Sequence, residues 1–383
     1  MGETTKAEDR ERELTEWAAK LGSEIKGYVA DHDRDGTFVA EAFKTLRDAG
    51  YFALAVPEEL GGRGATIRQV AMAQRELAHH CASTALATTM HHHIVLTTAW
   101  RFRRELPGAE AVLRRVVDDR VVLVSTGGAD FTRPRGEAVR VEGGFKVSGT
   151  KIFASQSPAG NVLVTMFPYD DPDEGRIVLN MSVPIASEGV EVLDNWDAMG
   201  MRGTGSGDVK LTDVFVPDER IMARRPYGVV DPMLQTVVAN ALSPIVAVYL
   251  GVAESARDAA IAAITGTPKA EDAGMQRRVG LMDARLRAAG WALDGALAAI
   301  GDDPAPSVDN IVYAMAAKKA VTDAAIEACD LAMEIVGGAG FFKGHPVERA
   351  YRDVRGIKFH PLDPETALVH TGKYLLGLPV DDL

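Results

Sequence analysis

Arg120-Val-Val-Leu-Val-Ser125 is the first of five short runs of apolar and β-branched residues that decide the fold. The other four are Gly144-Phe-Lys-Val-Ser148, Asn161-Val-Leu-Val-Thr165, Arg176-Ile-Val-Leu-Asn-Met-Ser-Val-Pro184 and Asp208-Val-Lys-Leu-Thr212. Clusters of Gly, Pro, Asn and Asp separate the runs, which is typical of short strands joined by turns. The stretch from Val121 to Pro217 therefore predicts an antiparallel meander or small barrel, and we expect strands nowhere else in the chain.

Two glycine-rich loops lie inside this stretch, Ser125-Thr-Gly-Gly-Ala-Asp130 and Gly203-Thr-Gly-Ser-Gly207. Phosphate-binding fingerprints require such a loop to follow a strand and to open a helix. Both loops here are expected to join one strand to the next. They are therefore interpreted as turns rather than as nucleotide-binding loops.

Helical patterns fill the rest of the chain. On the N-terminal side we expect helices at residues 7–30, around Val39, Phe43 and Leu46, and along one long region from about 66 to 103. On the C-terminal side we expect helices at 237–265, 274–300 and 307–336. The last has an apolar stripe at spacings of three and four and ends at Gly337-Gly338, where glycine is typical of a left-handed cap. Its stripe consists of Ala314, Ala317, Val321, Ala324, Ala328, Leu331 and Ile335.

The order of these patterns predicts an α+β fold with three domains. Residues 1–118 form an N-terminal helical domain, 119–224 a central antiparallel β-barrel or sandwich, and 225–383 a C-terminal four-helix bundle. The alanine-rich stripe of the last long helix favours close helix–helix approach, either within the bundle or across an oligomer interface.

Composition narrows the functional classes. The chain has 383 residues, 46% of them hydrophobic and 25% charged, and a formal net charge of −12. Such a charge argues against a general affinity for nucleic acid or an anionic membrane. No apolar run approaches the roughly 18 residues of a membrane span. Cys81 and Cys329 lie in apolar helical segments, which predicts buried free thiols and a reducing, cytoplasmic location.

Met90-His-His-His93 invites a metal-binding hypothesis. Successive helical positions point about 100° apart, so three neighbouring histidines cannot close on one ion. We expect one histidine to face inward and the others to face water, with no metal bound. His92 is kept as a candidate that could donate a hydrogen bond or move a proton near a cofactor.

Four ordered groups of motifs resemble signatures of the acyl-CoA dehydrogenase family, and the resemblance extends from about Leu46 to Gly377. One group lies in the N-terminal third, two lie in the strand block and one lies near the C-terminus. They are Ala53–Gly62, Gly144–Ser155, Trp196–Ser206 followed by Asp213–Pro217, and Val336–Phe341 with Pro346–Asp353.

The resemblance implies a tightly bound FAD between the strand domain and the C-terminal helices, in a homotetramer or homodimer. Phe153 matches an aromatic position against the flavin ring, and Ser155 matches a hydroxyl at the flavin N5 edge. Leu123, Ser125 and Thr126 correspond to the strand end that hydrogen-bonds the pyrimidine side of the flavin.

A second subunit is also expected to contact the cofactor. Gln276, Gly337 and Gly338 match positions that approach the adenosine diphosphate half of FAD from a neighbouring chain. The whole set suits a flavin, which needs an apolar face, a few donors at its polar edge and close backbone approach at its pyrophosphate.

The family oxidises an acyl-CoA thioester, and a carboxylate removes the α-proton while the β-hydrogen leaves as hydride to flavin N5. In this chain the usual position of the carboxylate falls on Pro361, and an alternative position falls on Leu242. A four-residue shift makes Glu365 the candidate base, with Asp363 as a second option. The same residues are also typical of a helix start, with Asp363 as N-cap and Pro364 after it.

Two other functions remain open. Arg355–Pro364 is similar to the C-terminal pattern of reduced-flavin monooxygenases of the same fold, in which a histidine near the flavin replaces the glutamate. His360, with His92, would then serve a site that uses oxygen and a flavin reductase and acts on an aromatic, thioether or amino-sugar substrate. A protein that binds flavin or an acyl thioester without turnover is the third hypothesis.

Our first expectation is α,β-dehydrogenation of an acyl-CoA in fatty acid metabolism, with electron-transfer flavoprotein as the oxidant.

Overall fold

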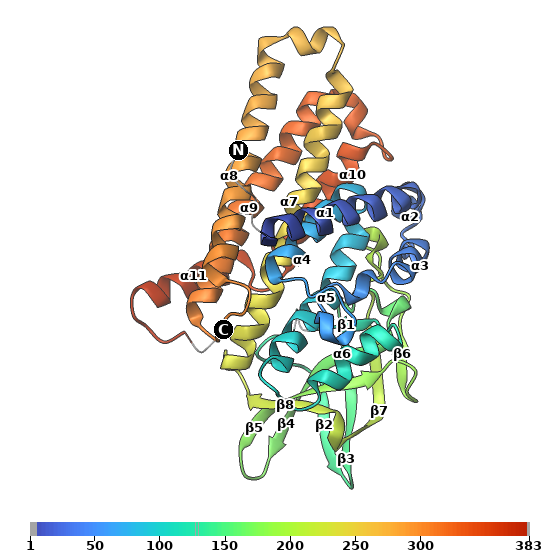
Figure 1. Cartoon of the computed structure of the whole chain (residues 1–383), viewed down its shortest axis with the longest axis vertical. Helices are drawn as coiled ribbons and strands as arrows, with labels where there is room; N and C mark the ends of the chain where they lie inside the picture. The colour runs from blue at the N-terminus through green and yellow to red at the C-terminus, as the bar shows by residue number, and fades with distance from the viewer. Residues whose placement is uncertain (1–5, 127, 129, 381–383) are drawn as a thin grey trace.

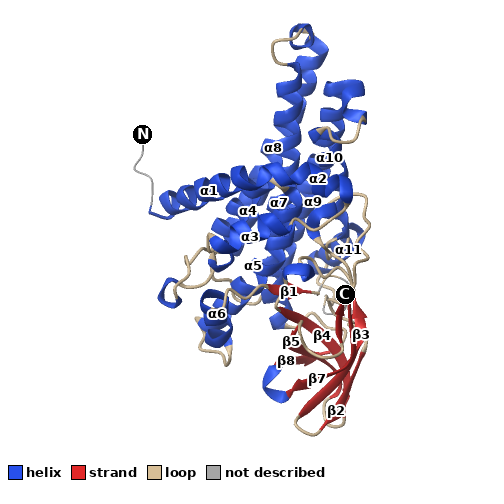
Figure 2. Ribbon diagram, turned by 90° about the vertical axis from the view of Figure 1, so that its right-hand side faces the viewer, coloured by secondary structure: helices blue, strands red, loops and turns tan. Residues whose placement is uncertain are grey.

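The computed structural model describes residues 6–126, 128 and 130–380 and confirms the predicted α+β order of helices, strands and helices. The strands gather at one end of the molecule, and the long helices extend from them toward the other end (Figures 1 and 2). Residues 127 and 129 of the first glycine-rich loop lie outside the described residues.

Six α-helices lie in the described N-terminal part, residues 6–118. They are α1 (Lys6–Ile25), α2 (Val29–Asp35), α3 (Ala40–Asp48), α4 (Ile67–His80), α5 (Ala82–Phe102) and α6 (Ala109–Asp118). The predicted helical region from about 66 to 103 is confirmed, but it is divided into α4 and α5 because Cys81 adopts an extended conformation with φ −149° and ψ 93°. α4 begins at a capping box in which Thr66 and Gln69 satisfy each other's backbone N–H groups. The break lets α5 turn away from α4.

The strands form two four-stranded sheets, ordered β1-β4-β5-β8 and β2-β3-β7-β6. Their bounds are β1 (Leu123–Ser125), β2 (Glu137–Val141), β3 (Gly144–Lys151), β4 (Val162–Asp171), β5 (Gly175–Pro184), β6 (Val190–Val192), β7 (Val209–Pro217) and β8 (Ile221–Pro226). Two expectations need correction. β1 pairs with β4 in parallel, so the block is not wholly antiparallel, and β8 lies beyond Pro217.

The two sheets enclose a core of their own, to which Phe145 and Phe167 contribute large buried side chains. A bulge lies in β7, where Thr212 and Asp213 together lie opposite Ser148 of β3, and Asp213 has a φ of +49°. The extra residue restores the inward direction of the next apolar side chains of β7, so both halves of that strand face the core. This arrangement is the sandwich form of the predicted domain.

The C-terminal part contains α7 (Pro232–Ile264), α8 (Ala273–Ile300), α9 (Val308–Val336), α10 (Pro346–Asp353) and α11 (Pro364–Leu375). The predicted stripe of α9 is buried except for Leu331, which is half-buried. α9 ends at Gly337, whose φ is +69°, as expected of a glycine cap. The short α10 packs on α7 and α9, and the predicted C-terminal helical domain is confirmed.

α7 connects the two helical parts. It is long and apolar enough to cross a membrane, but 94% of its most apolar window is buried inside this structure, as in the core helix of a globular protein. The N-terminal α4 and α5 pack against it on one side, and α8, α9 and α10 pack elsewhere along it. Cys81 and Cys329 are free and buried, as predicted. The proposed domain boundaries at 118 and 224 fall at the end of α6 and inside β8.

An ion pair joins α4 to α7 inside this interface. Arg75 Nε lies 2.8 Å from Glu254 Oε2, and His79 Nε2 lies 3.2 Å from the same oxygen. Burial raises the pKa of Glu254, but the hydrogen bonds from Arg75 and His79 outweigh that effect and lower the pKa to about 2. The carboxylate is therefore charged at neutral pH and satisfied by its two partners.

We expect Glu254→Gln to lower the free energy of unfolding by about 3 kcal/mol at pH 7, because Arg75 would lose its charged partner in a mostly buried position. Urea denaturation measures this change. Glu327→Gln is the matched control, since its pair with Arg285 is exposed and the substitution should cost less than about 0.5 kcal/mol. Equal effects of the two substitutions would contradict the expectation.

Candidate functional site

A cavity of about 160 Å³ lies where α5, α7 and the β1-β4-β5-β8 sheet meet. α5 contributes side chains spaced three to four positions apart, so one face of the helix forms a wall. The lining residues are Met90, His93, Ile94, Thr97, Thr98 and Arg101 of α5; Ser125, Gly128, Phe131, Val164, Thr165, Met166, Asn180, Met222 and Ala223 of the strand domain; Met233, Leu234, Val237, Val238, Ala241, Leu242 and Ile245 of α7; Ile311 and Met315 of α9; and His360, Pro361 and Leu362.

The cavity wall is mostly apolar and includes five methionines, Met90, Met166, Met222, Met233 and Met315. Arg101 is the one cationic side chain other than histidine among the described lining residues. The guanidinium donates to the carbonyl oxygen of Pro107 at 3.1 Å. No aspartate or glutamate belongs to the described part of the lining.

The three consecutive histidines have different roles, and all three are buried, so the expectation that two of them face water is wrong. His91 Nδ1 accepts from the Leu123 N–H at 3.0 Å, and its Nε2 lies 2.9 Å from the Phe52 carbonyl oxygen. Burial lowers the pKa of His91 to about 4, so the neutral ring bonds through both nitrogens. His91 thereby fixes β1 against α5.

His92, the predicted candidate, is not part of the cavity wall. Its ring packs against the rings of Tyr51 and Phe52, and neither of its nitrogens has a hydrogen-bond partner among the described residues. His93 is the histidine of this trio that lines the cavity. Burial lowers its pKa to about 4, so its ring is neutral at pH 7.

The predicted flavin contacts at the end of β1 differ in whether their polar groups are already engaged in hydrogen bonds within the protein. Ser125 lines the cavity. Thr126 is buried, and its hydroxyl donates to Thr165 Oγ1 at 2.9 Å. Leu123 has both backbone groups occupied, since its N–H donates to His91 and its carbonyl accepts from Gln156 Nε2 at 2.9 Å. Ser125 is therefore the residue of the three that remains available to a ligand.

Phe153 and Ser155 lie on the segment that follows β3. Phe153 has a φ of +56° and is 50% exposed. Its ring packs edge to face against the ring of Trp196, with 6.1 Å between the ring centroids. The Ser155 hydroxyl lies 2.8 Å from the Ser206 hydroxyl. An open aromatic face beside hydroxyl groups fits an isoalloxazine ring, which needs apolar stacking and a few polar contacts.

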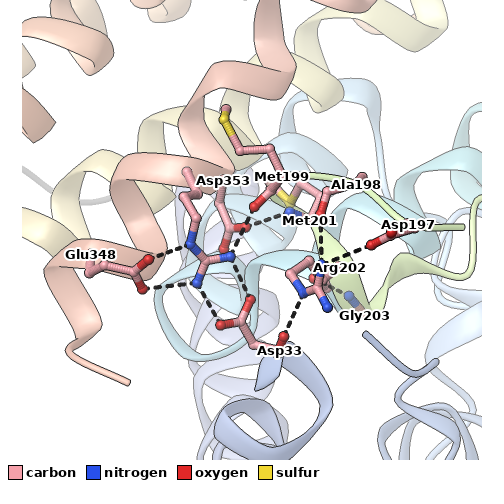
Figure 3. Close-up of polar contacts among 11 residues, drawn as sticks. Asp33, Asp197, Ala198, Met199, Met201, Arg202, Gly203, Glu348 and Asp353 are labelled. Atoms are coloured by element: carbon pink, nitrogen blue, oxygen red, sulfur yellow. Dashed lines mark hydrogen bonds and ion pairs between the residues drawn. The ribbon is translucent and has the colours of Figure 1, made fainter. Parts of the chain in front are cut away.

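A polar cluster holds the Trp196–Ser206 segment in place (Figure 3). The Met201 N–H donates to Asp353 Oδ1 at 2.5 Å, and Arg352 Nη1 donates to the Met199 carbonyl oxygen at 3.0 Å. Arg352 also pairs with Asp33 and Glu348, each at 2.6 Å. Together these bonds tie the segment to α10 and to α2.

The close contact at Gly200 reinforces this attachment. A Cβ atom at that position would lie 2.4 Å from the Arg352 carbonyl oxygen. Only glycine allows the Met199–Met201 backbone to approach the end of α10 so closely. The position of Trp196, and of Phe153 beside it, therefore depends on the end of α10.

His360 lines the cavity, as the predicted oxygen-using site requires. Its Nε2 lies 2.8 Å from the hydroxyl of Tyr249 on α7. Lys318 of α9 donates to the carbonyl oxygens of both His360 and Leu362. Burial lowers the pKa of Lys318 to about 8. The turn that carries His360 is thus held from α7 and from α9.

Glu365, the candidate base, is exposed on α11 and lines a separate hollow with Lys318 and Lys319. Asp363 caps α11 by accepting from the backbone N–H groups of Glu365 and Thr366, both at 3.1 Å. The helix-start interpretation of this segment therefore holds. The structure does not bring Glu365 to the cavity.

The two positions that the resemblance assigns to a carboxylate, Pro361 and Leu242, both line the cavity. Neither side chain can accept a proton. Ser243, which follows Leu242 on α7, is buried and its hydroxyl has no hydrogen-bond partner among the described residues.

Gln276, Gly337 and Gly338 lie near one another. Gln276 Nε2 donates to the Ala270 carbonyl oxygen at 2.9 Å, and Lys269 Nζ lies 3.5 Å from the Val336 carbonyl oxygen. In Figure 1 the start of α8 is at the opposite end of the molecule from the strands. Their predicted contact with the cofactor of a neighbouring subunit stays a prediction.

Sequence reasoning missed His93, Tyr249 and Lys318. His93 shares a helical face with Met90 and Thr97, which was a usable signal. Lys318 interrupts the apolar stripe of α9 between Ala314 and Val321, and Tyr249 is the one polar side chain between Pro244 and Ala253 of α7. A lone polar residue on an apolar face often has a buried partner.

Two family models match this chain. The acyl-CoA dehydrogenase N-terminal domain matches residues 8–105, and the acyl-CoA dehydrogenase C-terminal domain matches residues 238–360. L-evernosamine nitrososynthase of a Micromonospora species is 31% identical over 97% of this chain and 91% of its own length. The human mitochondrial short-chain specific acyl-CoA dehydrogenase is 25% identical over 87% of this chain and 81% of its own length.

A solved structure of KijD3 in complex with FMN and dTDP-3-amino-2,3,6-trideoxy-4-keto-3-methyl-D-glucose superimposes with a TM-score of 0.90. It is 30% identical and covers 100% of this chain and 97% of that chain. These matches confirm the predicted resemblance, the fold class and a flavin as the class of cofactor.

The Asp353 carboxyl group generates a pH prediction. Burial raises its pKa to about 6, above the ordinary value of 3.8. The native state then binds more protons than the unfolded state between about pH 4 and 6, so this group's contribution to stability falls by about 3 kcal/mol as the pH rises through that window.

We expect Asp353→Asn to remove the loss of stability that accompanies ionisation of Asp353. The free energy of unfolding of the variant should then rise more steeply from pH 4 to 7 than that of the unmodified protein. Urea denaturation in a buffer series measures the two slopes. Asp197→Asn is the control, because the Asp197 side chain is 95% exposed and its removal should leave the slope unchanged. Parallel curves for the Asp353 variant and the unmodified protein would refute the prediction.

Proposed function

Because this chain belongs to the acyl-CoA dehydrogenase family of flavin-dependent oxidoreductases, we propose that it is the oxygenase component of a two-component monooxygenase. Its substrate is a small, largely apolar molecule. Reduced flavin comes from a separate flavin reductase.

The observation that carries this proposal is the composition of the cavity. Removal of an α-proton from an acyl thioester requires a positioned base. Pro361 and Leu242 occupy the places assigned to that base, and no carboxylate belongs to the described lining. His360 is a poor substitute, since burial and the nearby Lys318 lower its pKa to about 3. Dehydrogenation of an acyl-CoA therefore lacks a proton acceptor here.

The residues around Phe153 support a bound flavin. The open ring of Phe153 and the Ser155 hydroxyl offer an apolar face and a polar group, and Gln156, which follows them, is hydrogen-bonded to Leu123 of β1, the strand that carries Ser125. When bound in its reduced form, a flavin supplies two electrons for the use of O₂, so that one oxygen atom enters the substrate and the other leaves as water. The chain's own residues bind the substrate, orient it and exclude water.

The cavity lining favours a substrate without a strongly charged group. A nucleotide sugar such as the one bound to KijD3 carries a diphosphate, and phosphate binding normally uses several arginines, lysines or helix N-termini. Arg101 is the single such cation among the described lining residues, and it already donates to a backbone carbonyl. Five methionines can adapt to an irregular apolar shape, and Asn180 and Thr98 offer polar anchors.

The relatives support chemistry of this class. The Micromonospora relative is named a nitrososynthase, and the solved relative holds FMN beside an amino sugar. An amine or a ring carbon of the substrate is the atom on which we expect oxygen to be placed. Electron-transfer flavoprotein, fatty acid metabolism and acyl-CoA remain predictions of the dehydrogenase hypothesis. The FAD form of the cofactor, the homotetramer or homodimer and the cytoplasmic location also stay predictions.

The first test combines two assays on the purified protein. With FMN, NADH, a flavin reductase and ¹⁸O₂, a panel of phenol, indole and thioanisole should yield a product with one labelled oxygen atom, detected by mass spectrometry. With bound FAD under anaerobic conditions, butyryl-CoA and longer acyl-CoA esters should leave the flavin absorption band unchanged. Anaerobic bleaching by an acyl-CoA, without oxygen incorporation, would establish the dehydrogenase instead.

A second test compares two substitutions near the C-terminus. His360→Ala should reduce oxygenation roughly a hundredfold, because the cavity loses a preorganised polar contact. Glu365→Gln should keep nearly the rate of the unmodified protein, since Glu365 lies outside the cavity. Initial rates of labelled product formation measure both effects. A loss in the Glu365 variant with full activity in the His360 variant would reverse the assignment.

A further inference from the structure

The hydroxyl of Tyr249 and the ring of His360 form a bond at the cavity wall whose polarity can be deduced. Tyr249 Oη lies 2.8 Å from His360 Nε2. The tyrosine is fully buried in the middle of α7, and the histidine lines the cavity. Either atom can be the donor on distance alone, so the proton must be located by other means.

Counting donors and acceptors locates it. Within the described residues, His360 Nε2 is the single hydrogen-bond partner of the Tyr249 hydroxyl. If Nε2 carried the ring proton, the phenol proton would have no acceptor, and a buried unsatisfied donor costs about 1–3 kcal/mol. If Tyr249 donates, Nε2 accepts and both groups are satisfied. A neutral imidazole then carries its own proton on Nδ1.

Burial keeps both groups neutral, as this count requires. It raises the pKa of Tyr249 well above its ordinary value, so the phenol retains its proton. It also lowers the pKa of His360 to about 3, with a further contribution from Lys318. At neutral pH the phenol therefore carries one proton and the imidazole ring carries one proton.

The surrounding backbone restricts movement of the pair. A Cβ atom on Gly356 would lie 2.6 Å from Tyr249 Oη, so the hydroxyl lies directly against the turn that precedes His360. Lys318 holds the carbonyl oxygens of His360 and Leu362 on the other side. With the turn fixed and Nε2 engaged, Nδ1 is the ring nitrogen that is left for a ligand.

We propose that Tyr249 is a positioning residue that fixes His360 in the Nδ1-protonated tautomer, so that His360 offers the cavity a hydrogen-bond donor and not a basic nitrogen. His360 then assists a substrate or cofactor atom that carries a lone pair or gains negative charge. Its expected influence on turnover rests on the proposed function, whereas the tautomer itself does not.

The tautomer can be measured without any activity. In protein labelled with ¹⁵N-histidine, long-range ¹H–¹⁵N correlation spectra at pH 7 distinguish the two neutral forms, and a His360→Gln sample identifies the His360 signals. We expect the Nδ1-protonated pattern in the unmodified protein. In Tyr249→Phe we expect a shift toward the Nε2-protonated pattern, because the donor to Nε2 is gone.

Tyr313→Phe is the matched control, since Tyr313 is 41% exposed on α9 and makes no hydrogen bond to His360 within the described chain. Its spectrum should match that of the unmodified protein. An Nε2-protonated His360 in the unmodified protein would overturn the proposal, and that observation needs no variant to fold. An unchanged tautomer in folded Tyr249→Phe would overturn it as well.

A kinetic measurement then separates positioning from packing. If oxygenation is established, Tyr249→Phe should lower kcat about tenfold and leave KM close to that of the unmodified protein, since the cavity walls are retained. A shifted tautomer with unchanged kcat would overturn the positioning role. Absence of oxygenation in every form would contradict the proposed function while leaving the tautomer result intact.

Discussion

The burial of the middle of α7, Val238–Glu254, on all sides is the constraint on which the rest of the structure depends. A helix that is apolar around most of its circumference cannot face water along any stripe, so it must be surrounded by other elements. α4 and α5 cover one side, and α8, α9 and α10 cover others. The N-terminal part of α7, from Met233 to Ile245, shares the wall of the cavity with α5 and the strand domain. Its position thus sets both the stability of the helical parts and the shape of the site.

Periodicity predicted most of the fold because the helices and strands here obey local rules. The stripe of α9 and the turn-separated runs of the strand block are readable in the sequence. The break at Cys81 was not, because neither glycine nor proline marks it; a change of backbone conformation at one residue separates α4 from α5. The parallel pairing of β1 with β4 was also missed, since pairing partners 39 residues apart leave no local pattern.

Residues of the candidate site could be predicted only where the resemblance to the family aligned this chain with known motif positions. Ser125 and His360 were found in that way, and both line the cavity. Glu365 was moved into the expected register by a shift of four residues, and the cap formed by Asp363 explains why that segment looked suitable. The contacts of His360 with Tyr249 and Lys318 join residues 111 and 42 positions apart. Such contacts follow from tertiary packing alone.

The methionine-rich cavity has a consequence for the working life of the protein. Thioethers are readily oxidised, and methionine sulfoxide is larger and far more polar than methionine. Under the proposed function, any hydrogen peroxide released when oxygen is consumed without substrate would form next to five such sulfurs. Each oxidation would make the cavity wall more polar and weaken its binding of an apolar substrate. The operating lifetime of an enzyme with this function would therefore depend on how tightly oxygen consumption is coupled to substrate binding.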